Sequence, residues 1–333
     1  MRLLHSTETT LNTITEQGVA RSSGTLQRSA DSNVHPALKP QRRDVGRFRE
    51  TRKIKLARWV FGKLSHYTPG IAARLAYRAL ATPPVSPERD WQAKLSHNAK
   101  ITKLPFAAGH ITVYEWGIGP TVLMVHGWGA RATHMGKMIQ PLVMAGYRVV
   151  SFDAPAHGDS SGKQTEPVEF AAAVHAVAKY AEHVHVAITH SFGAAGALLA
   201  QRDWGDIADH FVLVSPIESC MWFTEMFREY AGVSAEAMAR ARQIVVDRYN
   251  GRFLWERMSV VELVRSARRP TLLIHDQNDA EIPFAHSTAI LDAGPHVERF
   301  ATNELGHHRL LGDSRVIARV VRFVKERPHR YIG

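Results

Sequence analysis

The stretch ITHSFGAAG, residues 188–196, places a serine at the junction of two expected elements. The apolar run at 184–188 is typical of a buried β-strand, and the small residues after Ser191 favour the start of a helix. Serine is also a preferred residue at a helix N-terminus. From this stretch alone, Ser191 is explained equally well as a helix cap and as a nucleophile.

The segments around this stretch alternate between two patterns. Short apolar runs rich in β-branched residues predict strands, and the longer segments between them predict helices. The alternation indicates βαβ crossovers, so we expect an α/β fold with a mostly parallel central sheet and helices on both faces. The expected strands are 110–117, 121–127, 147–153, 184–190, 210–216, 271–276 and 296–302, and the expected helices are about 132–145, 166–182, 192–202, 284–292 and 312–326.

Residues 217–265 interrupt this alternation, because they have a helical pattern throughout and no strand pattern. We expect them to form a helical lid above the carboxyl edge of the sheet. Trp222, Phe223, Met226 and Phe227 recur there at helical spacing. This stripe is either the packing face of the lid or the lining of an acyl pocket, which would favour apolar substrates.

The first hundred residues differ from the main domain at 101–333. Residues 1–50 are rich in Ser, Thr, Arg and Gln and poor in aromatics, so we expect a disordered basic arm. Residues 51–100 predict a helical appendage and linker, with two helices separated at Thr68-Pro69-Gly70. We favour an appendage whose apolar face packs on the main domain. The alternative is a basic amphipathic hairpin that touches anionic lipid or nucleic acid. Peripheral contact with a membrane stays open, and a nucleic-acid partner is not expected.

The charge distribution and the cysteine content limit the classes of protein to which the chain can belong. Residues 1–100 contain 18 Lys and Arg against 7 Asp and Glu, whereas the remainder contains 24 of each, so the net charge of +11 belongs to the N-terminal part. A single cysteine excludes an intrachain disulfide and suits a reducing compartment. The sequence has neither a run of 18 apolar residues nor a signal-like apolar segment at its start, so we expect a cytoplasmic protein without a transmembrane helix.

Three chemically active residues follow expected strands, in the chain order Ser, Asp, His. Ser191 follows the strand at 184–190, Asp279 follows TLLIHDQN, and His307 lies in TNELGHHRLL after the last strand. In a sheet with helices on both faces, catalytic groups gather at the carboxyl ends of the strands. The three residues are therefore expected to meet at one edge of the sheet.

Several motifs in a fixed order accompany these residues. Together they resemble the α/β-hydrolase family, in its serine esterase and lipase branch, over about residues 105–326. The motifs are HGWG (126–129), FDAPAHGDS (152–160) with Ala156 in place of a usual glycine, THSFGAAG (189–196), and DAEIP (279–283) followed by GHHRLL (306–311). The resemblance implies a hydrolase that cleaves an ester or thioester through an acyl-enzyme, with an apolar acyl group favoured by the lid.

The resemblance also implies roles for individual residues. Ser191 would be the nucleophile, His307 the base that removes its proton, and Asp279 the acid that orients His307. The backbone N–H groups of Trp128 and Phe192 would form the oxyanion hole. No cofactor is implied, and no His, Asp or Glu group has metal-ligand spacing such as H-E-x-x-H, so no metal is expected.

Alternatives remain for two of these roles and for the activity. Glu218 follows an earlier strand and competes with Asp279 as the acid, although D-x-x-I-P fits the family's acid loop. His308 competes with His307, which the family register after a glycine favours. Thr189 stands where the family has a glycine before its nucleophile. An acyltransferase with the same triad, or a non-catalytic binding protein on the same fold, would explain the motifs as well.

Overall fold

The computed structural model describes residues 52–205, 207–251 and 253–327, and the expected disordered arm at 1–50 lies outside these ranges. Eight strands form one sheet in the order β1-β2-β4-β3-β5-β6-β7-β8. The pairs β1·β2 and β2·β4 are antiparallel and all other neighbours are parallel, which confirms the predicted mostly parallel sheet. The strands are β1 (Lys100–Phe106), β2 (Gly109–Trp116), β3 (Thr121–Val125), β4 (Arg148–Phe152), β5 (Val184–His190), β6 (His210–Val214), β7 (Thr271–Asp276) and β8 (Val297–Thr302).

Strand β1 is the strand that the sequence pattern missed. Its sequence KITKLPF has two lysines and a proline, and its side chains are mostly exposed. Among the described strands it pairs only with β2, with Pro105 opposite His110. Lysine and proline are typical of edge strands, where they discourage pairing with other chains. An edge strand of this kind lacks the apolar run by which the other strands were found.

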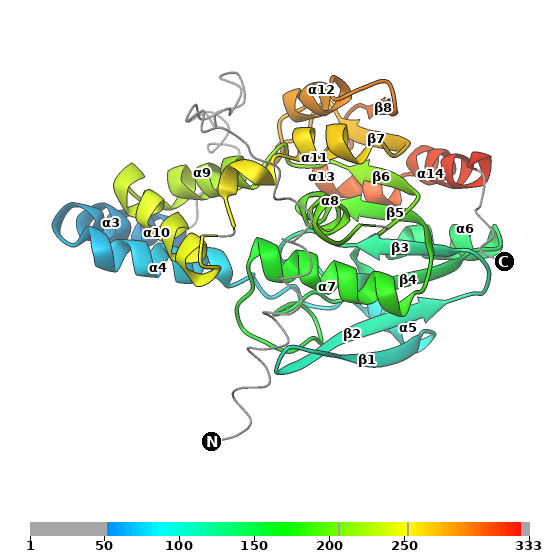
Figure 1. Ribbon diagram of the computed structural model, residues 1–333, viewed down its shortest axis with the longest axis horizontal. Coiled ribbons are helices and arrows are strands. Elements are labelled where there is room, and N and C mark those ends of the chain that lie inside the picture. The colour runs from blue at the N-terminus through cyan, green and yellow to red at the C-terminus, as the bar shows by residue number, and fades with distance from the viewer. Residues whose placement is uncertain (1–51, 206, 252, 328–333) are drawn as a thin grey trace.

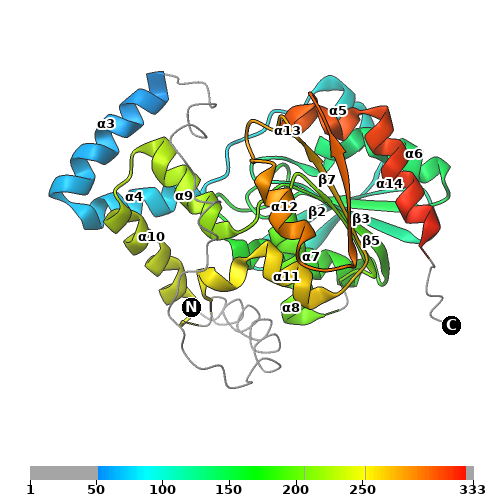
Figure 2. The ribbon, with the colours of Figure 1, turned by 90° about the horizontal axis from the view of Figure 1, so that it is seen from above.

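The central strands are buried on both faces because helices cover each side of the sheet (Figures 1 and 2). Along β5, Val186 and Ile188 belong to one apolar core and Ala187 to the other, as the two-residue period of a strand requires. One core includes residues of η2 (Ala132–Met138), α6 (Ile139–Met144) and α14 (Ser314–Glu326). The other includes residues of α7 (Pro167–Tyr180), α8 (Gly193–Trp204), α11 (Val260–Ala267) and α12 (Ala285–Leu291).

The predicted lid is helical in the structure, with α9 (Cys220–Ala231), α10 (Ala235–Arg248) and the 3-10 helix η3 (Trp255–Met258). An isolated bridge between Ser219 and Ser259 joins the two ends of this excursion. The next helix, α11, already packs on α8 and therefore covers the sheet. Of the predicted span 217–265, the part up to η3 projects as a lid and the last part belongs to the main domain.

The N-terminal appendage packs on this lid. Its helices are α3 (Arg52–Tyr67) and α4 (Pro69–Ala81), followed by α5 (Asp90–His97) beside the sheet. Helix α4 contacts α10 and α3 contacts α9, so the four helices form one layered projection (Figures 1 and 2). Arg58 Nε donates to Tyr230 O at 3.0 Å, and Ser234 N donates to Ser65 Oγ at 3.1 Å. The expected packing on the main domain is thus largely packing on the lid.

None of the helices within the described ranges combines the length and apolar character that crossing a bilayer requires.

Candidate active site

Ser191 lies in a sharp turn between β5 and α8. Its φ of +52° places this non-glycine residue in the left-handed region, which L-residues rarely adopt. The turn is held by hydrogen bonds from Ser191 N to Val214 O at 2.9 Å and from Ala194 N to Ser191 O at 3.2 Å. Helix α8 begins at Gly193, and its N-cap is Phe192 without a side-chain capping bond. The helix-cap explanation of Ser191 is therefore not supported by the geometry.

Close packing limits which residues can occupy the positions around the turn. A Cβ atom on Gly193 would lie 2.6 Å from the carbonyl oxygens of Val125 and His126, so only glycine fits there. A Cβ atom on Gly127 would lie 3.2 Å from Ser191 Cβ, which shows how closely the loop after β3 approaches the turn. Thr189, at the irregular position, is fully buried and donates to Val212 O at 3.3 Å. The threonine hydroxyl is thus accommodated by the neighbouring strand.

Asp279 and His307 form a buried hydrogen-bonded pair. His307 Nδ1 donates to Asp279 Oδ2 at 2.8 Å. The other carboxylate oxygen accepts from the backbone N–H groups of Glu281 and Ile282 at 2.8 and 2.9 Å. Burial alone would raise the pKa of Asp279, but hydrogen bonds with His275 and His307 outweigh it and hold this pKa well below its usual range. Asp279 is therefore an ionised acceptor that fixes the orientation of the imidazole.

The two alternative residues lie in other surroundings. Glu218 accepts from Ser219 Oγ at 2.8 Å at the base of α9. His308 forms an ion pair with Glu281, with Nε2 2.9 Å from Oε1, and its side chain is 56% exposed. The hydrogen bond that His308 donates to Glu281 raises the pKa of His308. A raised pKa leaves a smaller fraction of His308 unprotonated near neutral pH, and a protonated imidazole cannot remove the proton of a serine.

His190 supports the histidine loop from below. Its Nε2 lies 3.1 Å from His307 O, and the two rings are 4.6 Å apart between centroids. Burial holds the pKa of His190 well below its ordinary value. A neutral His190 can therefore donate from Nε2 and position the backbone of His307.

The expected oxyanion donors face the same turn. Within the described ranges, the backbone N–H groups of Trp128 and Phe192 donate no hydrogen bond, and the two rings meet edge to face with centroids 5.1 Å apart. The loop that contains Trp128 is held by Gly129 N, which donates to His157 Nε2 at 3.0 Å. Phe192 N lies at the N-terminal end of α8, where the helix dipole favours negative charge. Neither N–H group is therefore committed to another acceptor among the described residues.

The turn between β4 and α7 supports this loop. Asp153 accepts from Ala132 N at 2.7 Å through one oxygen and from Asp159 N at 2.8 Å through the other. Ala156, which replaces the usual glycine of this motif, has a φ of +63°. The left-handed conformation is therefore retained with alanine, at a cost in backbone strain.

A narrow apolar cavity of about 30 Å³ lies between the loop that contains Trp128 and the lid. Trp128, Phe192 and Phe223 form one wall, with ring centroids 5.1 to 6.0 Å apart. Phe223 thus lines the cavity as the predicted pocket requires. Trp222, one helical position earlier, is 1% exposed and packs edge-on against His286 at 4.5 Å.

The other predicted pocket residues, Met226 and Phe227, lie outside this lining and pack as half-buried side chains against the core. They follow Phe223 along α9, where the helix leaves the cavity. The stripe at helical spacing therefore divides between the cavity wall and lid packing.

The floor of the cavity includes a buried carboxylate that no motif signalled. Glu166 accepts from Tyr77 at 2.5 Å and pairs with Arg248 at 2.9 Å through the same oxygen, Oε1. Glu166 therefore links α4, α7 and α10 and gives the cavity a polar end.

One group of side chains could hold a metal ion. His185, Asp209 and His210 have ligand atoms within 4.8 Å of one another. They lie at the amino ends of β5 and β6, at the opposite edge of the sheet from Ser191. Pairing of parallel strands brings them together, so their separation in sequence gave no metal-like spacing. His183 Nε2 lies 3.0 Å from Asp209 Oδ2, so this carboxylate has a partner without a metal.

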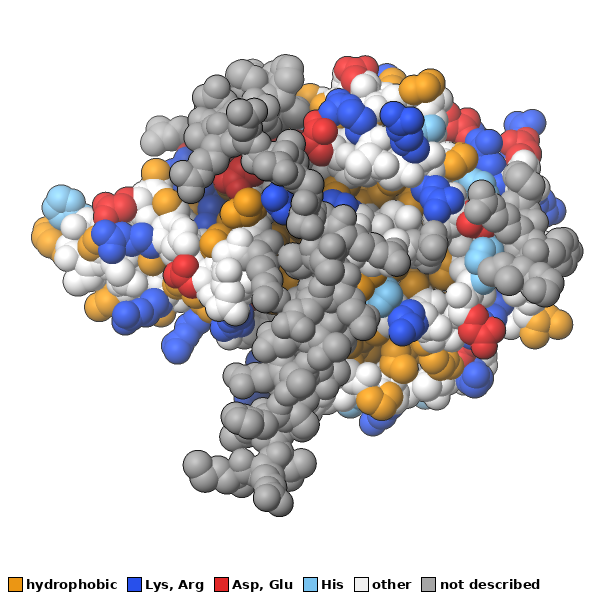
Figure 3. Space-filling model, in the orientation of Figure 1, with side chains coloured by type: hydrophobic (Ala, Val, Ile, Leu, Met, Phe, Trp, Pro, Cys, Tyr) orange, Lys and Arg blue, Asp and Glu red, His pale blue; other side chains and the backbone are white. Residues whose placement is uncertain are grey.

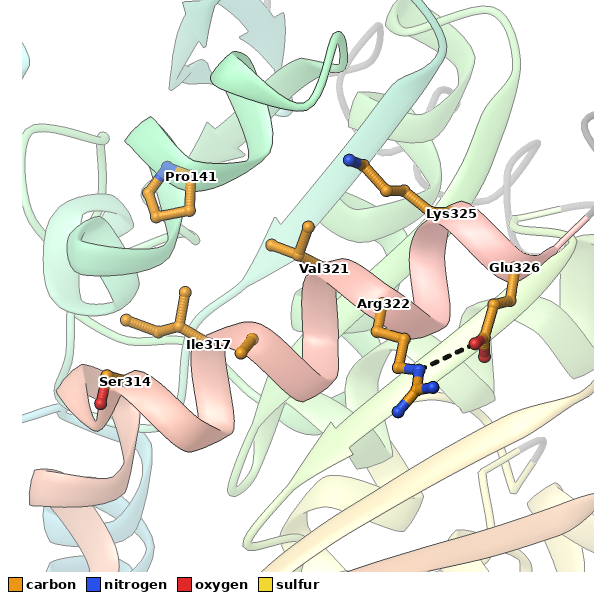
Figure 4. Close-up of a pocket in the computed structure, with 8 residues that line it drawn as sticks. Pro141, Ser314, Ile317, Val321, Arg322, Lys325 and Glu326 are labelled. Carbon is orange, nitrogen blue, oxygen red and sulfur yellow. Dashed lines mark hydrogen bonds and ion pairs between the residues drawn. The ribbon is translucent and has the colours of Figure 1, made fainter.

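A wider hollow of about 750 Å³ lies between α6 and α14 (Figure 4). Ile317 and Val321 point into it, and Arg322 pairs with Glu326 at its rim. None of the candidate catalytic side chains lines it. This hollow is therefore separate from the candidate active site.

Comparisons with known proteins agree with the fold described above. The family model described as "Alpha/beta hydrolase family" matches residues 122–322. The esterase Pf2001 of Pyrococcus furiosus is similar in fold, with a TM-score of 0.54, 22% identity and coverage of 73% of this chain and 98% of its own. The esterase RhEst1 of Rhodococcus has a TM-score of 0.53, 15% identity and coverage of 69% and 99%. A bromoperoxidase of Bacillus anthracis has a TM-score of 0.52, 16% identity and coverage of 69% and 100%. No curated protein matches the chain.

Proposed function

Because the chain belongs to the alpha/beta hydrolase family and is an enzyme of the hydrolase type, we propose that it is a serine hydrolase that cleaves a carboxylic ester or thioester. The observation that carries the proposal is a strained serine at the same edge of the sheet as a buried His–Asp pair. Ser191 has a φ of +52° at the end of β5, and His307 is bonded to Asp279 at 2.8 Å. Strain of this kind persists where the surrounding structure enforces it and is frequent at active sites.

The proposed reaction begins with attack of Ser191 Oγ on the carbonyl carbon of the substrate. His307 Nε2 removes the hydroxyl proton, and Asp279 stabilises the imidazolium that forms. The tetrahedral intermediate collapses when His307 returns this proton to the departing alkoxide or thiolate, which leaves an acyl-serine. Water deprotonated by His307 then attacks the acyl-serine, and the acid and free Ser191 are released.

The developing oxyanion would accept hydrogen bonds from Trp128 N and Phe192 N. Donors already in place need no reorganisation during the reaction, and one such donor contributes about 10²–10³ in rate. The ionised state of Asp279 supports the same scheme, because a carboxylate with a strongly lowered pKa stays charged throughout the neutral range. The tautomer of His307 with its proton on Nδ1 leaves Nε2 free to act as a base.

We further propose that the acyl group is apolar, which the wall of Trp128, Phe192 and Phe223 supports. A cavity of about 30 Å³ is close to the volume of one water molecule, so a substrate needs movement of α9 or of Phe223 to enter. A cytoplasmic location is part of the proposal, since one buried cysteine suits a reducing compartment.

A fluorophosphonate probe tests the nucleophile. We expect covalent labelling of the wild-type chain and loss of labelling in Ser191→Ala. Ser215→Ala is the matched control, because Ser215 follows the neighbouring strand β6, is buried and also has a positive φ, of +44°. Labelling that persists in Ser191→Ala, or that disappears in Ser215→Ala alone, would show that another serine is the nucleophile.

Turnover distinguishes the activity from its alternatives. With p-nitrophenyl esters of increasing chain length, we expect hydrolysis in water that depends on Ser191 and His307. Product formed only when an alcohol or thiol acceptor is added would identify an acyltransferase. If the probe does not label the chain and no ester is turned over, the remaining alternative is a binding protein on the hydrolase fold.

A further inference from the structure

Helix α3 has an outward face that mixes large apolar side chains with cations. The residues Arg52, Leu56, Trp59, Lys63 and Tyr67 are spaced four, three, four and four positions apart, so they lie on one side of the helix. All five are exposed in the structure, with Leu56, Trp59 and Tyr67 at 61%, 64% and 71%. This face is directed to solvent along the length of α3.

The exposed apolar residues of α3 are distinct from the residues by which α3 packs on the rest of the protein. The opposite side of the helix provides Phe61 and Leu64, which pack against the core. It also carries Arg58, whose side chain and backbone approach Gly232 at the end of α9. Leu56 and Trp59 are therefore not required for docking of α3 on the lid. Keeping them in water is unfavourable, which indicates another partner.

Helix α4 repeats this arrangement. Ala72, Ala73 and Ala76 are buried on its inner side, and small residues at these positions allow α10 to pack closely. The outer side exposes Ile71 at 49% and Leu75 at 38%, together with Arg74 and Arg78. Tyr67 ends α3 and Ile71 lies near the start of α4, so exposed apolar residues lie on both sides of the turn at Thr68.

Both the apolar exposure and the charge are concentrated in this hairpin, which we define as residues 52–81. Five of the eleven large hydrophobic residues that are exposed within the described ranges belong to it. The hairpin also contains seven Lys and Arg residues and no Asp or Glu. Figure 3 shows orange and blue side chains side by side on this projection, at the left of the molecule. The combination fits a partner that is both anionic and apolar.

We propose that the hairpin binds the surface of a membrane that contains anionic lipids. Leu56, Ile71 and Leu75 would enter the boundary between headgroups and acyl chains, with Trp59 and Tyr67 at headgroup level. The surrounding arginines and lysines would meet lipid phosphates while their apolar stems stay in the interface. A nucleic acid could contact the cations and stack on Trp59, but it would leave the aliphatic side chains in water.

Binding of the hairpin would also place the lid at the lipid surface. Helix α3 is bonded to the α9–α10 segment through Arg58 and Ser65, and α4 is packed along α10. The cavity behind Phe223 is bounded by residues of the same α4 and α10. The membrane proposal itself rests on the exposed face and not on the proposed activity.

Vesicle sedimentation of the full chain tests the proposal. We expect binding to phosphatidylglycerol–phosphatidylcholine vesicles, weaker binding to phosphatidylcholine vesicles, and weakening by added salt. The double variant Leu56→Ser/Trp59→Ser should lose about tenfold or more in affinity, since a buried apolar side chain contributes at least that factor. Lys63→Glu/Arg74→Glu should lose the preference for the anionic vesicles.

Matched controls separate this surface from the rest of the molecule. Ile118 and Met144 are 87% and 79% exposed on the main domain, and Ile118→Ser and Met144→Ser should bind vesicles like the wild type. Trp59→Phe should retain binding, because an aromatic ring remains. All substituted positions are exposed, so unchanged thermal unfolding is expected and verifies the fold.

Several outcomes would overturn the proposal. These are absence of wild-type binding to anionic vesicles, equal binding by the hairpin and control variants, or hairpin variants that lose binding to single-stranded DNA but not to vesicles. The last outcome would identify a nucleic-acid surface. Ser191→Ala should bind vesicles like the wild type, so failure of the proposed activity and failure of membrane binding are distinguishable.

Discussion

His307 Nδ1 lies 2.8 Å from Asp279 Oδ2, which joins the loop after β8 to the loop after β7 across 28 residues of sequence. Adjacent parallel strands end at the same edge of the sheet, and this places the two loops side by side. The bond orients Nδ1 of the imidazole toward the carboxylate and leaves Nε2 for the role of base that the proposed reaction requires. The predictions below depend on this pair, its neighbours and the elements that support them.

The identity of the acid can be tested by paired amide substitutions. Asp279→Asn should lower kcat by about 10³–10⁴, because an amide favours the wrong tautomer of His307, while KM changes little. Glu218→Gln should retain activity within about tenfold, since Glu218 bonds to Ser219. Steady-state kinetics on a p-nitrophenyl ester measures both. A collapse of kcat in Glu218→Gln alone would assign the acid to Glu218.

Substitution of the two adjacent histidines should lower kcat to very different extents. His307→Ala should lose about 10³-fold or more in kcat, as expected for removal of the general base. His308→Ala should keep activity within about tenfold, because His308 pairs with Glu281 near the surface and its raised pKa favours the protonated form. The comparison is made at neutral pH with both variants shown to be folded by circular dichroism. Equal losses in the two variants would contradict the assignment.

Acyl-chain preference should depend on Phe223. Phe223→Ala removes one wall of the cavity beside Trp128 and Phe192, so kcat/KM should rise for longer acyl chains relative to shorter ones, by roughly tenfold. Met226→Ala is the control on the same helix, since Met226 lies outside the cavity lining. The measurement is the ratio of kcat/KM across a series of ester chain lengths. An equal change in both variants would point to loosening of the lid instead.

Stability should depend on pH through Glu115. Burial alone would raise its pKa, but hydrogen bonds from Tyr180, Lys100 and Arg148 outweigh it and lower the pKa to about 2 from 4.5. The folded-state pKa is depressed, so the stabilisation is present above about pH 4.5 and is lost as the pH falls toward 2. Glu115→Gln should therefore lower the free energy of unfolding by roughly 2–3 kcal/mol at pH 7.

Urea unfolding between pH 7 and pH 3 measures this effect. The difference between Glu115→Gln and the wild type should shrink as the pH falls, and a constant difference would contradict the electrostatic origin. Glu262→Gln is the control, because the side chain of Glu262 is 64% exposed in its pair with Arg265. Exposed pairs contribute little, so this variant should stay within about 0.5 kcal/mol of the wild type.

The sequence by itself determined the local features of this protein. The two-residue period of the strands and the longer period of the helices follow from which side chains must be buried, so the order of elements from β2 to α14 could be predicted. Ser191 could be placed after β5 because a strand pattern ends there and Gly193 permits a tight turn. These signals depend on residues within a few positions of one another, and a sequence displays them directly.

Only the tertiary structure decided which distant residues meet. The sequence left Asp279 and Glu218 as alternatives, and the pairing of β7 with β8 brings Asp279 to His307. Likewise, the amphipathic pattern of α3 and α4 showed that they bury one side but not that this side packs on the lid. Edge strand β1 was missed because a half-exposed strand has little apolar signal. Contacts of this kind depend on where loops return the chain in space, and residue spacing does not encode that directly.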